Sequence, residues 1–289
     1  MRKSIRLSLA ALAALGACAA NPHQPPPDRL TRTFAVPIVA GQHTLELHVG
    51  NGQVTVAHGE APHCDVSACV RAASPAEASR LASEIVLLPD PSDDGVQVVA
   101  LRMPRPGSVE AVNLFVTVLA PPDLAVRVLT QRAAVVAQGY RGNLTVDTDS
   151  GDVRARLDGG STDIRSRSGG VRVCGTFARA AVNSDSGPVA VVLAGGTPPS
   201  AVDVRTQGGD VTVEVPQASR VAFSARVRNG RNVPCELAAA WHEYGTDAGD
   251  RWRAFRGDLG AATVADEHPS KVSIESESGR VAVRCLPGT

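Results

Sequence analysis

The sequence is poor in aromatic residues and has no excess of either charge. Aromatic side chains make up 3% of the 289 residues, which argues against a wide core of large rings and favours a narrow core of small aliphatic side chains. Lysine and arginine number 29, and aspartate and glutamate also number 29. The chain therefore has no overall field that would attract nucleic acid, and we expect no nucleic-acid partner.

Long apolar runs are also missing. The run from Leu7 to Leu15 follows a basic start, is too short to span a bilayer and is typical of a secretory signal peptide. The letters LGAC, ending at Cys18, resemble the lipobox of bacterial lipoproteins, in which the signal is removed before a lipid-modified cysteine. We therefore predict a signal peptide at 1–17 and a lipid on Cys18 that holds the protein to a membrane of the cell envelope. Ordinary cleavage after Ala19 is the alternative, and it would release a soluble exported protein.

A proline-rich stretch follows the predicted lipidation site. Residues 18–30 include NPHQPPPDRL, which has few groups to bury and favours an extended conformation. This segment is predicted to be a tether between the membrane and the folded part.

The cysteines indicate an oxidising compartment without a metal site. Five of the six remain if Cys18 carries lipid, so at least one is expected to be unpaired within the chain. The pairs considered as disulfides are Cys64 with Cys69 and Cys235 with Cys285. Zinc near His63 is the rival interpretation, but the chain lacks a second Cys or His pair at finger spacing. We expect no metal and no other cofactor.

The segment 31–120 mixes strand and helix patterns. The letters HTLELHVGNGQVTVAH alternate around Asn51 and Gly52, which predicts a hairpin of two strands. The letters SPAEASRLASEIVLL predict a short helix, with Ser74 as N-cap and Pro75 at the first helical position. The side chains expected on its buried face are Leu81, Ile85 and Leu88.

From residue 121 onward the chain repeats a unit of strand, glycine turn and strand. The turns TQRAAV, TDSGDV, SRSGGV and SDSGPV follow one another at offsets of eighteen residues, TQGGDV follows after twenty-two, and SESGRV comes last. Apolar and polar side chains alternate on both strands of each unit, which gives one apolar face. The period predicts an all-β fold, a right-handed parallel β-solenoid of coils of 18–22 residues, with the segment 236–269 as an insertion.

The charges support coils that stack in register. Residues eighteen apart would then lie about 4.8 Å from each other. One outward column reads Asp149, Arg167 and Asp185, which alternates in sign as stable neighbours should.

The end of the chain gives a sharper prediction. Superposing Gly230 and Gly279 places the strand 271–277 directly on the strand 221–227. Arg226 then lies opposite Glu275, and Arg228 lies opposite Glu277. In this arrangement the segment 237–269 is excluded from the stack as a side excursion.

The acidic letters DTDSGD, at residues 147–152, could form either a calcium loop or a turn. The corresponding letters in other units are SRSGG and SDSGP, so the shared element is a small residue before glycine and not the acids. The positions of the glycines and of the acid at 158 also differ from those of an EF-hand loop. We interpret the cluster as a turn.

These repeats resemble a known family. The run from VNLFVTVLAPPDLAVRV through NLTVDTDSGDVRARL to AVDVRTQGGDVTVEVP is similar to the candidate-adhesin beta-strand-repeat family of bacterial envelope proteins, a domain of unknown function. The resemblance covers about 113–215 and again 270–283. It implies an extracytoplasmic β-helical fold with a role in adhesion or envelope association, and it brings no catalytic residues.

The insertion concentrates aromatic side chains. The residues in question are Trp241, Tyr244, Trp252 and Phe255. Two interpretations stay open: a cap over the open end of the solenoid, or an aromatic surface for a ligand such as a sugar. The same segment contains the integrin-binding letters RGD at 256–258, which would matter only on an exposed loop.

A catalytic site is not apparent in the sequence. The histidines lie outside the regular repeats, and neither G-x-S-x-G nor H-E-x-x-H occurs. The acids Asp147, Asp149 and Asp163 could in principle serve a polysaccharide-cleaving β-helix, but they are more simply solvated charges on strand faces. We therefore predict a non-catalytic binding or adhesion scaffold with a protein or glycan ligand. The alternative is an envelope-maintenance or signalling lipoprotein that binds another protein.

Overall fold

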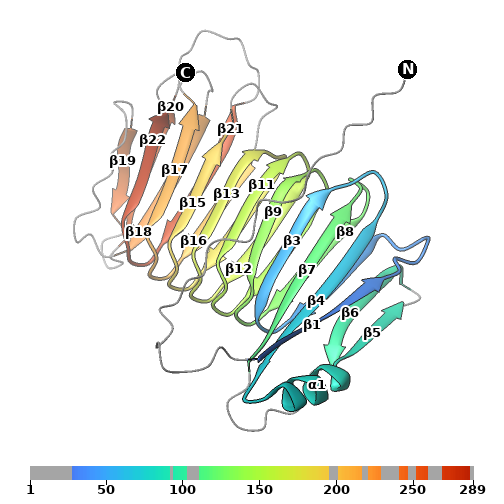
Figure 1. Ribbon diagram of the computed structural model, residues 1–289. Coiled ribbons are helices and arrows are strands. Elements are labelled where there is room, and N and C mark those ends of the chain that lie inside the picture. Colours follow the sequence, from blue (N-terminus) through green and yellow to red (C-terminus); the bar gives the residue numbers. More distant parts are fainter. Residues whose placement is uncertain are drawn as a thin grey trace.

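The computed structural model describes residues 28–91, 94–102, 111–194, 201–216, 221–228, 241–246, 252–259 and 269–286. Within these ranges the protein is all-β with a single helix, as predicted. Its strands form two large sheets that face each other along the length of the molecule (Figure 1).

Sheet A has ten strands. In spatial order they are β1 (Asp28–Val36), β4 (His63–Ala72), β7 (Ala111–Ala120), β3 (Gly52–His58), β9 (Ala134–Tyr140), β11 (Val153–Asp158), β13 (Val171–Thr176), β15 (Val189–Leu193), β17 (Val211–Pro216) and β22 (Val281–Leu286).

Sheet B has twelve strands. In spatial order they are β19 (Trp241–Thr246), β20 (Trp252–Leu259), β18 (Val221–Arg228), β21 (Ser270–Ser276), β16 (Ala201–Thr206), β14 (Arg179–Ser184), β12 (Ser161–Ser166), β10 (Leu144–Thr148), β8 (Ala125–Thr130), β2 (Thr44–Val49), β6 (Val96–Arg102) and β5 (Val86–Pro91).

The repeats stack in register, as the charge columns predicted. Successive strands enter the two sheets alternately, and the strands of neighbouring units pair in parallel. Asp147 pairs with Arg165 and Arg165 with Asn183, at the offset of eighteen that the sequence shows. Asp149 and Arg167 form an ion pair of 3.3 Å. The stack is therefore held in the register that places opposite charges next to each other.

The sheets as a whole are mixed, and this differs from an all-parallel solenoid. At one end β1, β4 and β7 pair antiparallel, as do β5 and β6. At the other end β18 and β20 pair antiparallel, as do β20 and β19. Repetition of the unit dictates parallel pairing only where units follow one another, and the non-repeating terminal segments are free to return in the opposite direction.

The turn sequence is explained by hydrogen bonds within and between units. In the turns that begin at Thr148, Ser166, Ser184 and Thr206, the first hydroxyl is buried and bonds the glycine three residues later. Thr148 Oγ1 accepts from Gly151 N at 2.9 Å, and Ser166 Oγ donates to Gly169 O at 2.9 Å. The third-position serine joins the neighbouring unit, since Ser168 Oγ donates to Asp149 O at 3.0 Å. The structure confirms that DTDSGD is a turn.

The core lies between the two sheets and consists mainly of small aliphatic side chains. The apolar inward side chains of the central strands are buried, as at Val146 and Ile164 of sheet B and Ala155 and Val173 of sheet A. Apolar side chains from both sheets belong to one continuous cluster. Burial of apolar surface stabilises by about 25 cal/mol for each Å² removed from water. The stability of the stack therefore comes from many small aliphatic side chains along its length and not from large rings.

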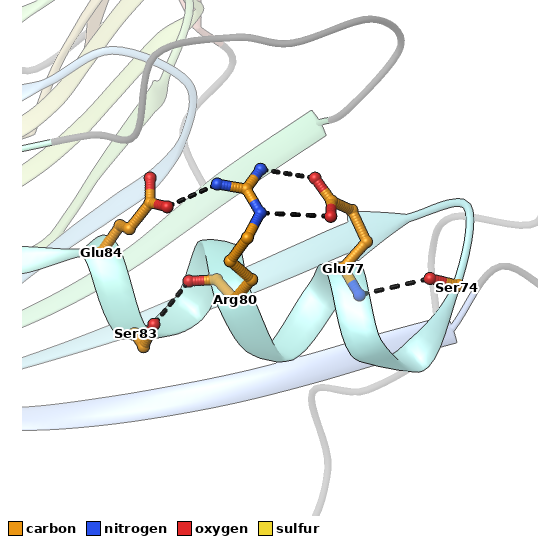
Figure 2. A network of polar contacts seen from close by, with 5 residues as sticks. All are labelled: Ser74, Glu77, Arg80, Ser83 and Glu84. Atoms are coloured by element: carbon orange, nitrogen blue, oxygen red, sulfur yellow. Dashed lines mark hydrogen bonds and ion pairs between the residues drawn. The ribbon is translucent and has the colours of Figure 1, made fainter.

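The predicted helix is present as α1 (Pro75–Glu84), and it lies against β1 and β4 at one end of the stack. Ser74 is its N-cap and accepts a hydrogen bond from Glu77 N at 3.2 Å. Figure 2 shows the exposed face of the helix, where Arg80 Nε donates to Glu77 at 3.1 Å and its guanidinium also pairs with Glu84. Such exposed ion pairs contribute little to stability.

The buried face of α1 differs from the prediction at one position. Leu81 and Ile85 are buried, but Leu88 is 47% exposed because the helix ends at Glu84 and the chain continues as strand β5. The C-terminus of α1 is fixed by the guanidinium of Arg32, which donates to the carbonyl of Ala82 at 2.9 Å and to that of Ile85 at 3.2 Å. A cation at this position satisfies free carbonyls and the helix dipole.

The predicted hairpin at Asn51 and Gly52 is wrong. The strands on either side, β2 and β3, belong to different sheets: β2 pairs with β8 and β6, whereas β3 pairs with β9 and β7. A hairpin and a corner between two sheets share the same alternation and the same glycine, so the local sequence does not separate them. The segment 31–120 therefore adds to the same two sheets, and the tether predicted at 18–30 is already strand β1 from Asp28.

At the other end, the predicted pairing of the last strand is confirmed. Strand β21 pairs in parallel with β18, with Arg226 opposite Glu275. Arg228 and Glu277 lie 4.0 Å apart. Strand β21 also pairs with β16 on its other side, so it is inserted between two strands that precede it in the chain.

The exclusion of 237–269 is wrong. Strands β19 and β20 of this segment continue sheet B beyond β18. The outer edge of β18 carries free backbone groups, and pairing with β20 satisfies them.

The disulfide considered between Cys64 and Cys69 is absent, and both are free thiols. They lie five positions apart on the straight strand β4, which separates them by about 16 Å. A disulfide requires Cα atoms about 4.4–6.8 Å apart. The odd spacing also directs the two side chains to opposite faces, so Cys64 enters the core and Cys69 lies on the outer face of sheet A.

Burial of Cys64 leads to a prediction on alkaline stability. Burial, with a smaller effect of Asp65, raises the pKa of the Cys64 thiol from 9.0 to about 12. Between these values the unfolded chain loses a proton that the folded protein keeps, so stability falls as pH rises, by at most about 1.4 kcal/mol per pH unit. Chemical denaturation from pH 8 to 11 under reducing conditions should show a shallower fall for Cys64→Ala than for the wild type. Parallel slopes would contradict the assignment.

Within the described ranges, the structure contains no helix that is both long and apolar enough to cross a membrane.

Candidate functional site

The aromatic residues of the insertion divide into buried and partly covered side chains. Phe255 points into the core from β20 and is 2% exposed. Trp252 is half-buried on the outer face, where the guanidinium of Arg226 lies 4.8 Å from its ring centre and that of Arg228 lies 5.9 Å away. The side chains of Trp241 and Tyr244 lie outside the described residues. Phe255 therefore packs into the core at the end of sheet B, which favours the cap for this ring.

The RGD letters do not lie on a loop. Arg256, Gly257 and Asp258 are part of β20, which is paired with β18 on one side. Arg256 and Gly257 are also paired with β19 on the other side. Their backbone groups are engaged in the sheet, so the display that integrin recognition needs is missing.

Of the acids considered for catalysis, Asp147 and Asp163 lie on strand faces and Asp149 lies in the turn after β10. Asp149 is paired with Arg167, and Asp147 lies directly opposite Arg165. Asp163 lies between Thr145 and Ala181. Across the described parts of the chain, no group of three or more His, Cys, Asp or Glu side chains is placed to hold a metal ion.

Three of the predicted cysteine positions fall where the structure gives no side-chain information. Cys18 and Cys235 lie outside the described residues. Cys285 belongs to β22, opposite Val215, but its side chain is not described. Lipidation at Cys18 and a disulfide between Cys235 and Cys285 therefore stay predictions.

The outer faces of the two sheets differ in how they arrange charge. On sheet B, basic and acidic side chains alternate and form ion pairs, as between Arg127 and Glu46 at 3.0 Å and between Arg205 and Glu275 at 3.9 Å. In these columns the acidic side chains neutralise the basic side chains of the neighbouring strands. Sheet B therefore presents little uncompensated charge along these columns.

Sheet A carries an arginine cluster, which we define as Arg154, Arg156 and Arg172. Arg154 and Arg172 are direct cross-strand partners on β11 and β13, and Arg156 lies two residues beyond Arg154 on the same face. All three are exposed, and none forms an ion pair with any other described residue. Like charges directly opposite each other destabilise a sheet, so this arrangement departs from the rule that sheet B follows.

A shallow groove of about 530 Å³ runs beside the arginine cluster. Arg154 and Arg172 line one part of it, and the small residues Gly170 and Ala190 leave space above the sheet. Asp152 and Asp210 lie at its turn end. Their carboxylates accept hydrogen bonds from Gly170 N at 3.0 Å and Arg280 N at 2.8 Å. These acids thereby join neighbouring units, and the arginines present their donors to solvent.

The sequence contained the signal for this cluster. Arg154 and Arg172 are eighteen residues apart, the same offset at which Asp149 and Arg167 alternate in sign. In the column through Arg154 and Arg172, two positive charges follow each other. This column therefore differs from the columns in which acidic and basic residues alternate.

Comparison of the sequence with protein-family models finds no match, and comparison with curated proteins finds none either.

Some solved structures share a weak overall likeness with the chain. A candidate cell adhesion protein from Clostridium sporogenes is 12% identical, with a TM-score of 0.36, and the match covers 90% of this chain and 100% of that one. A candidate adhesin from Bacteroides fragilis is 14% identical, with a TM-score of 0.39 and coverage of 90% and 97%. A candidate adhesin from Parabacteroides distasonis is 11% identical, with a TM-score of 0.41 and coverage of 90% and 98%. At these values the likeness assigns neither a family nor a function.

Proposed function

We propose that the protein is an exported, lipid-anchored scaffold of the bacterial envelope, which binds a ligand without transforming it. The observation that carries the proposal is the contrast between a long, regular stack and an arginine cluster on one of its faces that forms no ion pair with any other described residue. A rigid sheet surface holds such side chains at fixed spacings, which suits recognition of an extended ligand.

The repeated turns support a repeat architecture for this role. We propose that the central units, from β8 to β17, form a right-handed parallel β-solenoid, the hand that parallel crossovers favour. Repeats of this kind give extended binding surfaces because each unit adds one strand to each face.

Anchoring is tested at Cys18. If Cys18 carries lipid, the full chain expressed in a bacterial host is recovered with the membranes, and Cys18→Ser moves it to the soluble exported fraction. Mass spectrometry of the mature N-terminus checks the modification directly. An unmodified wild-type chain that begins at residue 20 would contradict the proposal and show ordinary cleavage.

Binding is tested separately from anchoring. The immobilised mature protein is exposed to two preparations of bacterial envelope, one of isolated polysaccharide and one of protein extract. Retention of either material by the wild type, and not by a blank surface, is the expected result. Retention of neither would overturn the scaffold. An envelope-maintenance protein that binds another protein, our second candidate, would retain the protein extract alone.

A further inference from the structure

We propose that the arginine cluster of sheet A binds an acidic polysaccharide through the carboxylates of its sugars. This inference rests on the proposed binding function and names the class of ligand. The juxtaposition that carries it is the direct pairing of Arg154 with Arg172, with Arg156 on the same face.

The cluster is costly without an anion. In a parallel sheet the Arg154 and Arg172 backbones lie about 4.8 Å apart, and their charges repel. On sheet B the chain places an acid at such a position, as Asp147 opposite Arg165. On sheet A the neighbours of the pair in the same row are Val136 and Ala190, which offer no charge. A bound anion between the two guanidinium groups would convert repulsion into two attractive interactions.

The surroundings match a polysaccharide. In the row that contains Arg154 and Arg172, Thr55 and Thr117 lie on one side and Thr212 lies on the other, and Gln138 is opposite Arg156. These uncharged groups suit sugar hydroxyls. Arg156 lies about 6.6 Å along the strand from Arg154, so a second carboxylate of the same polymer can reach it.

Nucleic acid and membrane fit less well. Single-stranded nucleic acid needs aromatic side chains on which bases stack, and the outer faces of β9, β11, β13, β15 and β17 contain no aromatic residue at their described positions. Stable attraction to an anionic membrane takes a larger group of basic residues than three. An acidic polysaccharide fits better, because its planar carboxylates match the arginines and its hydroxyl groups match the threonines of the same row.

The experiment compares polygalacturonate with its methyl-esterified form, which keeps the polymer and removes the charge. The mature wild-type protein is expected to bind polygalacturonate at least ten times more tightly than the ester. The double variant Arg154→Gln/Arg172→Gln should lose at least tenfold in affinity. The matched control Arg165→Gln/Arg167→Gln removes one arginine from β12 of sheet B and one from the turn after it, and should change the affinity less than twofold.

Two further measurements separate binding from folding. The double variant on sheet A should keep or raise the melting temperature, because it removes a repulsive pair, so weaker binding is not explained by unfolding. The thiol of Cys174 lies opposite Arg156 on β13, and polygalacturonate should slow its alkylation. Cys69 lies on the outer face of β4 in the same sheet, with four strands between β4 and β13, and its alkylation should be unchanged.

The outcomes divide cleanly. Equal binding of the ester, equal binding by the sheet A variant, or a preference for single-stranded DNA or anionic phospholipid vesicles would each overturn the polysaccharide site. If polygalacturonate is not bound while envelope material is retained, this inference fails and the scaffold stands. If neither is bound, the proposed function fails with it.

Discussion

Gly169→Ala is expected to lower the free energy of unfolding by about 2–4 kcal/mol, whereas Gly170→Ala, at the next residue, should cost less than about 1 kcal/mol. The difference comes from space. A Cβ at Gly169 would lie 2.1 Å from the carbonyl oxygen of Gly151 in the neighbouring unit. A Cβ at Gly170 would lie 3.4 Å from its nearest neighbour, the carboxylate of Asp152, and 3.6 Å from Pro188.

The clash recurs along the stack, which makes the prediction a test of the whole architecture. The would-be Cβ of Gly187 meets the carbonyl of Gly169 at 2.1 Å, and that of Gly209 meets the carbonyl of Gly187 at 2.0 Å. Because these atoms belong to backbone on both sides, a shift in one unit must be transmitted to the next. Urea denaturation of the two single variants, followed by circular dichroism, measures the difference. Equal stability of Gly169→Ala and the wild type would show that the units are not stacked this closely.

Phe255→Ala is expected to cost about 3–5 kcal/mol, because a ring buried at the end of the core leaves a cavity when it is removed. Phe255 is 2% exposed and lies opposite Ala225 on the inner face of sheet B. The expected loss tests whether the insertion acts as a cap, since a surface that only binds a ligand would not contribute to stability.

Phe115→Ala is the matched control. Phe115 is also a strand phenylalanine, but it lies on the outer face of β7 and is 48% exposed. Its removal should cost less than about 1 kcal/mol, because little area is withdrawn from water in the folded state. Similar losses for the two variants, measured by the same denaturation, would contradict the cap.

The strand partners at the two ends of the stack could be predicted only in part: the pairing of β21 with β18 was predicted, whereas the places of β2, β3 and β20 were not. Alternating apolar residues around Gly52 fit a hairpin as well as a corner between two sheets, because both need one apolar face and one tight turn. Which partner the strand finds depends on where other strands leave an unpaired edge. In this protein β2 lies between β6 and β8 in sheet B, and β3 lies between β7 and β9 in sheet A. Strand β21 lies between β16 and β18. Both insertions join segments that are far apart in the chain.

The candidate site was predictable only in part. The aromatic insertion attracted notice because its composition is unusual, yet burial of Phe255 gives it a role in packing. The arginine cluster went unnoticed because each arginine alone is an ordinary outward residue of an alternating strand. The cluster is recognised only from its cross-strand neighbours, because Arg154 and Arg172 repel each other only when β11 and β13 pair in register.

By itself the sequence determined the repeat, the inward face of each strand and the turn chemistry. These follow from interactions within a unit or between identical units, such as the bond from Gly151 N to Thr148 Oγ1 and the pairing of residues eighteen apart. The tertiary structure decided where β2 and β3 enter the two sheets, the pairing of β21 with β16, and the addition of β20 to the edge of sheet B. Those features depend on contacts between segments with no local signal for each other, because a strand edge accepts any partner that satisfies its backbone and matches its apolar face.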